Sequence, residues 1–155
     1  MKEIDILIAK ILDILIGIPQ KDIEIVLPII YDTKMSFSVY METKNIQKVW
    51  GYSTSFQYQG KIVKIIDLSL IWGIGKGIHK FKYILACKGI AIKVDDIVKI
   101  ETFSLGDLYL FPSYLQRILN FKYIWGIAKK EKDYIYLMDP EIFKKEMGEV
   151  HEKIL

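Results

Sequence analysis

Short apolar runs rich in isoleucine alternate with short polar stretches along the chain. Isoleucine is stiff at χ1 and suits a pleated, half-buried surface, so these runs predict β-strands. Near the N-terminus we expect two strands, Ile4–Lys10 and Ile14–Ile18. The residues between them include no Gly or Asn, which hairpin turns favour, so a single helix over residues 4–16 is an open alternative.

A unit of strand, cap and short helix occurs twice. The β-branched run Ile62–Ile66 ends at Asp67, whose side chain can accept a hydrogen bond from a following backbone N–H, as helix N-caps do. The same order recurs where a strand over Asp133–Met138 leads into Asp139, followed by Pro140 at a position suited to the first turn of a helix. We therefore expect a short central helix and a C-terminal helix.

The same pattern of β-branched residues between turn signals predicts the remaining strands. They are Asp22–Leu27, which Pro28 should end, a hairpin of Phe81–Cys87 and Ile90–Val94, and Phe121–Lys129. A short helix is expected over Phe111–Leu119. The signal is weakest over residues 29–52.

The chain also shows an internal repeat. Residues 16–23 resemble residues 90–97, and Asp67 matches Asp139 at nearly the same offset. Two similar offsets suggest two copies of a small β-module. Short strands separated by turns favour small barrels over a parallel sheet.

Length and composition favour a single domain with a substantial core. The chain has 155 residues, of which 52% are hydrophobic. No stretch approaches the roughly 20 uninterrupted apolar residues that span a bilayer, because Asp5, Lys10 and Asp13 interrupt the richest segment, Ile4–Ile18. Nothing resembles an export signal, and the single Cys87 cannot form an internal disulfide, so we expect a cytoplasmic protein.

The charge gives little support for nucleic-acid binding. The net charge is only +3, and Arg117 is the single arginine, although guanidinium groups are preferred for binding phosphates and base edges. The competing hypothesis is nevertheless a small barrel that binds single-stranded nucleic acid by stacking bases on aromatic rings. Its platform would be Tyr52, Phe56 and Tyr58 beside Lys61 and Lys64.

No arrangement of residues indicates catalysis. Asp95 and Asp96 would point to opposite faces of a strand, which makes a poor acid–base pair. His79 and His151 have no second ligand at a metal-binding spacing, so both are expected on the surface. Cys87 lies in an apolar strand, which raises a thiol pKa rather than lowering it. We expect no enzyme, no metal site and no cofactor.

Three segments occur in an order and spacing that are informative together. Residues 54–60 precede the apolar run Ile62–Ile66 and Asp67, and residues 90–97 and 123–128 follow. The order resembles the CheW-like domain family of bacterial chemotaxis coupling proteins, which has G-[VI]-[IV]-N-L-R-G before a strand and [IV]-D-L, then G-[LI]-x-V-D-x-V, then Y-[IV]-x-G-[IV]-[AG].

The resemblance implies an all-β fold of two intertwined small SH3-like β-barrels with short helices, including the C-terminal one. The whole chain, 1–155, would form one CheW-like domain. Its barrel modules would cover roughly 14–73 and 80–143, with the terminal segments crossing between them. Such domains bind through barrel faces and the hydrophobic groove between the barrels.

The resemblance further implies a non-enzymatic adaptor that links the cytoplasmic tip of a methyl-accepting chemoreceptor to the regulatory domain of the histidine kinase CheA. Neither nucleic acid nor membrane insertion would be involved. The candidate partner-binding residues are Ile23, Ile25, Tyr58, Gln59, Ile97 and Val98. Gln59 and Ile25 stand where the family has an Arg and an acidic residue. Packing into the barrel cores is an equal alternative for Ile23 and Ile97, which occupy matching positions in the two modules.

Overall fold

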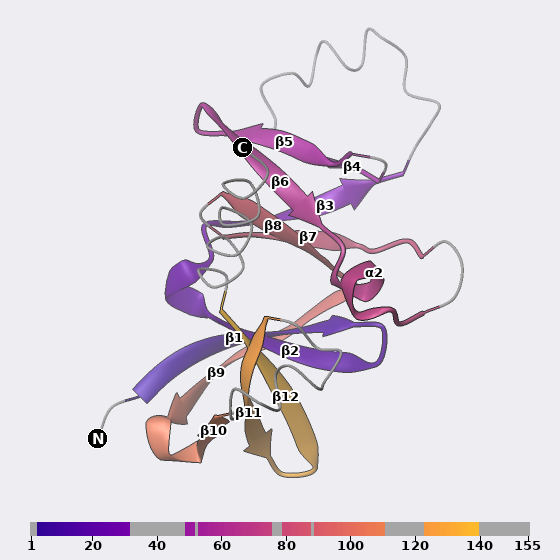
Figure 1. The fold of residues 1–155 in the computed structure, drawn as a ribbon. Helices are drawn as coiled ribbons and strands as arrows, with labels where there is room; N and C mark the ends of the chain where they lie inside the picture. Colours follow the sequence, from indigo (N-terminus) through magenta and orange to yellow (C-terminus); the bar gives the residue numbers. More distant parts are fainter. Residues whose placement is uncertain are drawn as a thin grey trace, which may run out of the picture.

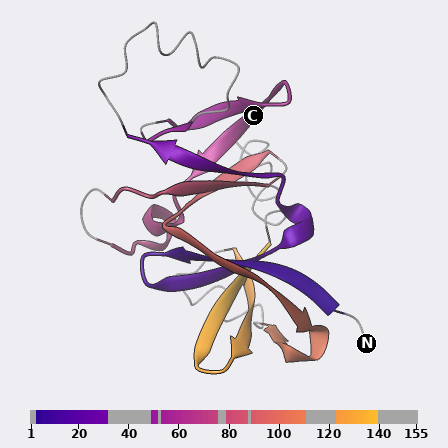
Figure 2. The same ribbon diagram turned by 180° about the vertical axis from the view of Figure 1, so that it is seen from behind.

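The computed structural model describes residues 3–31, 49–51, 53–75, 79–87, 89–110 and 123–139. The strands in these ranges form two six-stranded sheets, which lie one above the other in Figures 1 and 2. The terminal sheet takes its strands from both ends of the chain, and the central sheet takes its strands from the middle. The predicted all-β fold is confirmed.

The terminal sheet has the strand order β10-β11-β12-β2-β1-β9. Its strands are β1 (Glu3–Ile11), β2 (Ile14–Pro19), β9 (Asp96–Ser104), β10 (Leu108–Leu110), β11 (Ile124–Lys130) and β12 (Asp133–Met138). The central sheet has the order β4-β3-β7-β8-β6-β5. Its strands are β3 (Ile25–Ile30), β4 (Val49–Trp50), β5 (Ser55–Tyr58), β6 (Lys61–Ile66), β7 (Tyr83–Cys87) and β8 (Ile90–Val94).

The sheets do not follow the expected modules of 14–73 and 80–143. In the described elements the chain passes from the terminal sheet to the central sheet after β2 and returns after β8. Strand β2 then pairs in parallel with β12, with Leu15 opposite Ile135. A repeat in sequence cannot reveal this exchange, because pairing between distant strands leaves no local pattern.

The N-terminal segment is a hairpin, so the alternative of a helix over residues 4–16 is wrong. Strands β1 and β2 pair antiparallel up to Ile11 opposite Ile14. Along β1, Ile6 and Ile8 point into the core of the terminal sheet, while Leu7 points into the core between the sheets. Burial on both faces explains why the run is apolar at nearly every position.

The predicted strand Asp22–Leu27 begins and ends later than expected. Gln20–Asp22 form a short 3-10 helix, η1, and β3 continues through Pro28 to Ile30. Successive N–H groups of a strand point to opposite edges, and that of Ile29 donates to the Lys82 carbonyl beside β7. The missing N–H of Pro28 therefore falls at the edge away from β7, where no hydrogen bond to β7 is lost.

The predicted cap at Asp67 is confirmed. Its Oδ1 accepts hydrogen bonds from the backbone N–H groups of Ser69, at 3.0 Å, and Leu70, at 3.3 Å, at the start of helix α2 (Leu68–Trp72). Gly73, at φ 68°, ends the helix in the left-handed conformation that glycine adopts readily. The helices expected at Phe111–Leu119 and from Pro140 lie outside the described residues, as does His151.

Candidate interaction surface

The six candidate contact residues form three pairs on different parts of the fold. Ile23 lies between η1 and β3, and Ile25 is the first residue of β3. Tyr58 ends β5, and Gln59 lies in the following turn. Ile97 and Val98 belong to β9, in the other sheet. Because β7, β8 and β6 separate β3 from β5 in the central sheet, the pairs do not form one continuous strip along it.

Four of the six side chains belong partly to the core. Ile23, Ile25, Tyr58 and Ile97 are half-buried and pack against the apolar cluster between the sheets. For Ile23 and Ile97, where core packing was the open alternative, a large part of each side chain is therefore buried in the core. Each keeps an accessible part, so a partner would contact an edge of these side chains rather than a whole one.

Gln59 is exposed at the tip of the β5–β6 hairpin. Tyr58 pairs with Lys61 across a two-residue turn, in which Gln59 has φ 50° and Gly60 has φ 74°. Two positive φ values define the turn type that matches the twist of a tight hairpin. The turn places the Gln59 side chain in solvent, where a partner can reach it.

Val98 is exposed because it lies in a β-bulge. Lys99 pairs with Ile8 and Ile97 pairs with Ala9, which leaves Val98 as the extra residue of β9. The bulge lets Ile97 face the core between the sheets while 46% of Val98 remains exposed. These two neighbouring candidate residues therefore have different environments.

Val98 also lines a cavity of about 120 Å³ on the terminal sheet. Its apolar lining includes Ile8, Leu15 and Ile135. The charged residues around it are Lys99, Glu101, Lys130, Glu131 and Asp133. An apolar floor with charges of both signs around it can receive an apolar side chain of a partner, with the charges contributing to specificity.

An ion-pair cluster connects β9 with β11 beside this cavity. Glu101 contacts the ammonium of Lys130 and lies 3.6 Å from that of Lys99. The hydrogen bond from Lys130 lowers the pKa of Glu101, and its charge and that of Lys99 act in the same direction. Strand β10 pairs only with Gly126–Ala128, so Lys130 extends past it toward β9. This cluster was not predicted from the sequence, although alternation along a strand places Lys99 and Glu101 on one face.

Further exposed apolar side chains were not predicted. They include Ile100, Tyr109, Leu110 and Tyr134 on the terminal sheet, Ile62 on the central sheet and Leu70 on helix α2. Ile100 is 51% exposed and lies two residues beyond Val98, so β9 presents apolar surface over a longer stretch than expected. Apolar groups that gather at a surface commonly mark contact sites.

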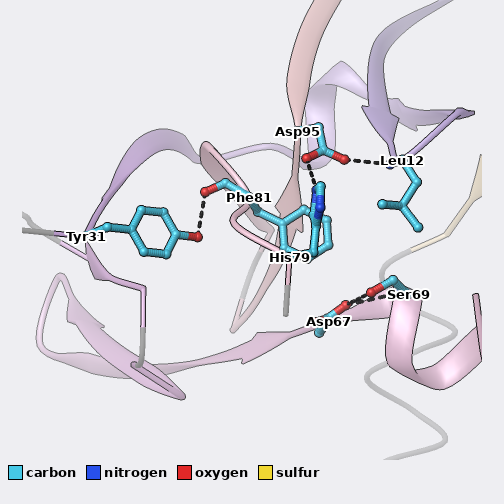
Figure 3. Close-up of polar contacts among 7 residues, drawn as sticks. All are labelled: Leu12, Tyr31, Asp67, Ser69, His79, Phe81 and Asp95. Carbon is cyan, nitrogen blue, oxygen red and sulfur yellow. Dashed lines mark hydrogen bonds and ion pairs between the residues drawn. The ribbon is translucent and has the colours of Figure 1, made fainter. Parts of the chain in front are cut away.

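The polar groups considered for chemistry have structural partners. Burial raises the pKa of the Cys87 thiol to about 12, in the expected direction. His79 is partly exposed but not isolated, because its Nε2 contacts Asp95 Oδ1 (Figure 3). Proximity in sequence could not reveal this pair, whose members are 16 positions apart. Asp96 instead accepts a hydrogen bond from the N–H of Ile97.

Two further observations concern the described ranges only. They contain no group of three or more His, Cys, Asp or Glu side chains that could hold a metal ion. No helix there is long and apolar enough to cross a membrane.

The architecture is that of an all-β protein with two sheets that exchange strands, and the terminal sheet carries the cavity beside Val98. Among solved structures, it is similar to the crystal structure of the scaffolding protein TtCheW from Thermoanaerobacter tengcongensis. The TM-score is 0.63 at 18% sequence identity, over 89% of this chain and 90% of the other. No protein-family model and no curated protein sequence matches the chain. The likeness therefore establishes a CheW-like fold.

Proposed function

We propose that this protein is a non-enzymatic coupling protein of a bacterial chemotaxis system. It links the cytoplasmic tip of a methyl-accepting chemoreceptor to the regulatory domain of a CheA-type histidine kinase, and it acts in the cytoplasm without a cofactor. The observation that carries the proposal is the shared fold with a protein described as a CheW scaffold, over about nine-tenths of both chains. The motif order around Asp67 and Asp95 supports the same role.

The contact surface includes Gln59 at the tip of the central sheet and Val98 on β9, because both are exposed. Ile25 and Tyr58 contribute the accessible edges of half-buried side chains, as do Ile23 and Ile97. Binding would bury apolar surface at each place, with Lys99 and Glu101 beside Val98 contributing to the choice of partner.

The alternative of a nucleic-acid-binding barrel receives less support. Phe56 and Tyr58, two rings of its stacking platform, pack partly against the core between the sheets. Base stacking needs an exposed ring face, so burial reduces what these rings can offer.

Calorimetric titration tests the proposal, using the CheA regulatory domain and the receptor-tip hairpin of the same organism. We expect the wild type to bind at least one of them, and Val98→Asp to weaken that binding about tenfold or more, since a charge would replace an apolar contact. Ile25→Asp should act in the same direction, provided that circular dichroism shows an intact fold.

Leu70→Asp is the matched control. Leu70 is also apolar and 77% exposed, but it lies on α2, outside the proposed surface. An Asp near a helix N-terminus is well tolerated, so this variant should fold and bind normally. Absence of wild-type binding to both partners would disprove the coupling role. Equal binding by the wild type and folded Val98→Asp would show that the surface lies elsewhere.

A further inference from the structure

The chain returns from the central sheet to the terminal sheet through one residue, Asp95. Val94 is the last residue of β8, and Asp96 is the first residue of β9. The backbone N–H of Asp95 donates to the carbonyl of Lys10 in β1, at 2.7 Å. The crossover is therefore attached to the terminal sheet by its main chain.

The two carboxylate oxygens of Asp95 have partners that lie beside different sheets. Oδ2 accepts a hydrogen bond of 2.5 Å from the N–H of Leu12, in the β1–β2 turn of the terminal sheet. Oδ1 contacts Nε2 of His79, in the segment that leads into β7 of the central sheet (Figure 3). Only 20% of the Asp95 side chain is exposed, so water competes weakly for these contacts.

His79 is itself attached to the central sheet. Its ring packs edge-on against Phe81, with 4.6 Å between the ring centroids, and Phe81 is almost fully buried. The carbonyl of Phe81 accepts a hydrogen bond from the Tyr31 hydroxyl at 2.7 Å, just beyond β3 (Figure 3). The N–H of Lys82 donates to the carbonyl of Val94. These contacts fix the position of His79 relative to the central sheet.

The apolar core between the sheets holds them together through hydrophobic contact, which is non-directional. Hydrogen bonds are directional and weaken steeply as their angle changes. We propose that Leu12, His79 and Asp95 form an inter-sheet clasp that sets the orientation of the terminal sheet relative to the central sheet. The clasp also holds the β1–β2 turn, in which Leu12 has φ 55° without the freedom of a glycine.

Two measurements on the full chain test the clasp. Amide hydrogen exchange, followed by NMR, reports the Leu12 N–H directly. Electron–electron double resonance between spin labels at Gln57→Cys and Lys132→Cys, in a Cys87→Ala background, reports the distance between the sheets. Both label sites are exposed; Gln57 lies in β5, and Lys132 lies in the β11–β12 turn.

Three variants distinguish the contribution of the Asp95–Leu12 hydrogen bond from that of the Asp95–His79 contact. Asp95→Ala removes both side-chain contacts, so we expect Leu12 exchange to accelerate about tenfold or more and the distance distribution to widen. His79→Ala removes only the contact with the central sheet, so the distribution should widen while Leu12 stays protected. Asp96→Ala is the matched control, because it removes the neighbouring carboxylate, which accepts a hydrogen bond from the adjacent N–H of Ile97, and it should change neither quantity.

An unchanged distance distribution in folded His79→Ala would overturn the proposal, and so would an equal widening in Asp96→Ala. If Asp95→Ala fails to fold, His79→Ala still decides the question. Neither measurement uses a partner, so the clasp can stand or fall independently of the chemotaxis role.

Discussion

The small size of Gly17 matters to the packing of the terminal sheet. A Cβ there would lie 2.7 Å from Cγ2 of Ile6 and 2.9 Å from Cγ2 of Ile135, both in the core. Ile6 and Ile135 are almost fully buried, so moving either side chain away would disturb its packed neighbours. Only glycine allows the three strands to approach this closely.

We predict that Gly17→Ala lowers the free energy of unfolding by about 1–3 kcal/mol, as overpacking of cores commonly does. Gly106→Ala is the control, because the nearest atom to its added Cβ is Ser104 Oγ, 4.0 Å away. Urea denaturation, monitored by circular dichroism, measures the free energy of unfolding of both variants. Similar losses for the two variants would contradict the packing argument.

Glu101 should make the stability depend on pH. Its pKa is lowered from its ordinary value of 4.5 in the folded protein, chiefly by the hydrogen bond from Lys130. A lowered carboxyl pKa stabilises the folded state above the ordinary pKa, and this contribution disappears as the pH falls through the folded value.

We therefore predict that Glu101→Gln lowers the free energy of unfolding at pH 7 by roughly 0.5–1 kcal/mol. The difference from the wild type should shrink below a pH of about 4.5. Denaturation curves at several pH values measure this difference. A difference that stays constant down to pH values at which Glu101 is protonated would show that the ion pair contributes nothing.

At the scale of elements, helix α2 depends strongly on its cap because it has only five residues. Oδ1 of Asp67 bonds the N–H groups of Ser69 and Leu70 and also the Ser69 hydroxyl. We predict that Asp67→Ala lowers the free energy of unfolding by about 1 kcal/mol, whereas Asp67→Ser retains most of the stability. Thermal denaturation of the three proteins measures this, and equal losses for Ala and Ser would argue against capping.

At the scale of the whole molecule, the net charge of +3 and the single arginine leave few phosphate contacts. We predict no submicromolar binding of single-stranded DNA or RNA at low salt, because few counterions would be released. Fluorescence anisotropy with labelled oligonucleotides measures the affinity. Tight binding that falls steeply with added salt would favour the nucleic-acid hypothesis over the coupling role.

The sequence by itself determined the features that arise between near neighbours in the chain. The isoleucine runs specify strands, because a β-branched residue prefers extended backbone wherever it lies. Asp67 caps α2 by accepting hydrogen bonds from N–H groups two and three residues further on. Gly60 supports a tight turn because it readily adopts the positive φ that the turn requires. The all-β fold could be predicted for this reason, and so could several strands, among them Ile90–Val94 and Asp133–Met138.

The tertiary structure decided whatever depends on a partner distant in sequence. The N-terminal run is a hairpin whose two faces are both buried, and the N–H of Leu12 in its turn donates to the carboxylate of Asp95, 83 positions away. Pro28 fits within β3 because its missing N–H falls at the edge away from β7. Val98 is exposed because pairing with β1 places a bulge there. Such contacts join residues that are far apart in the sequence and share no local pattern. Their contributions therefore cannot be predicted from the sequence around either residue.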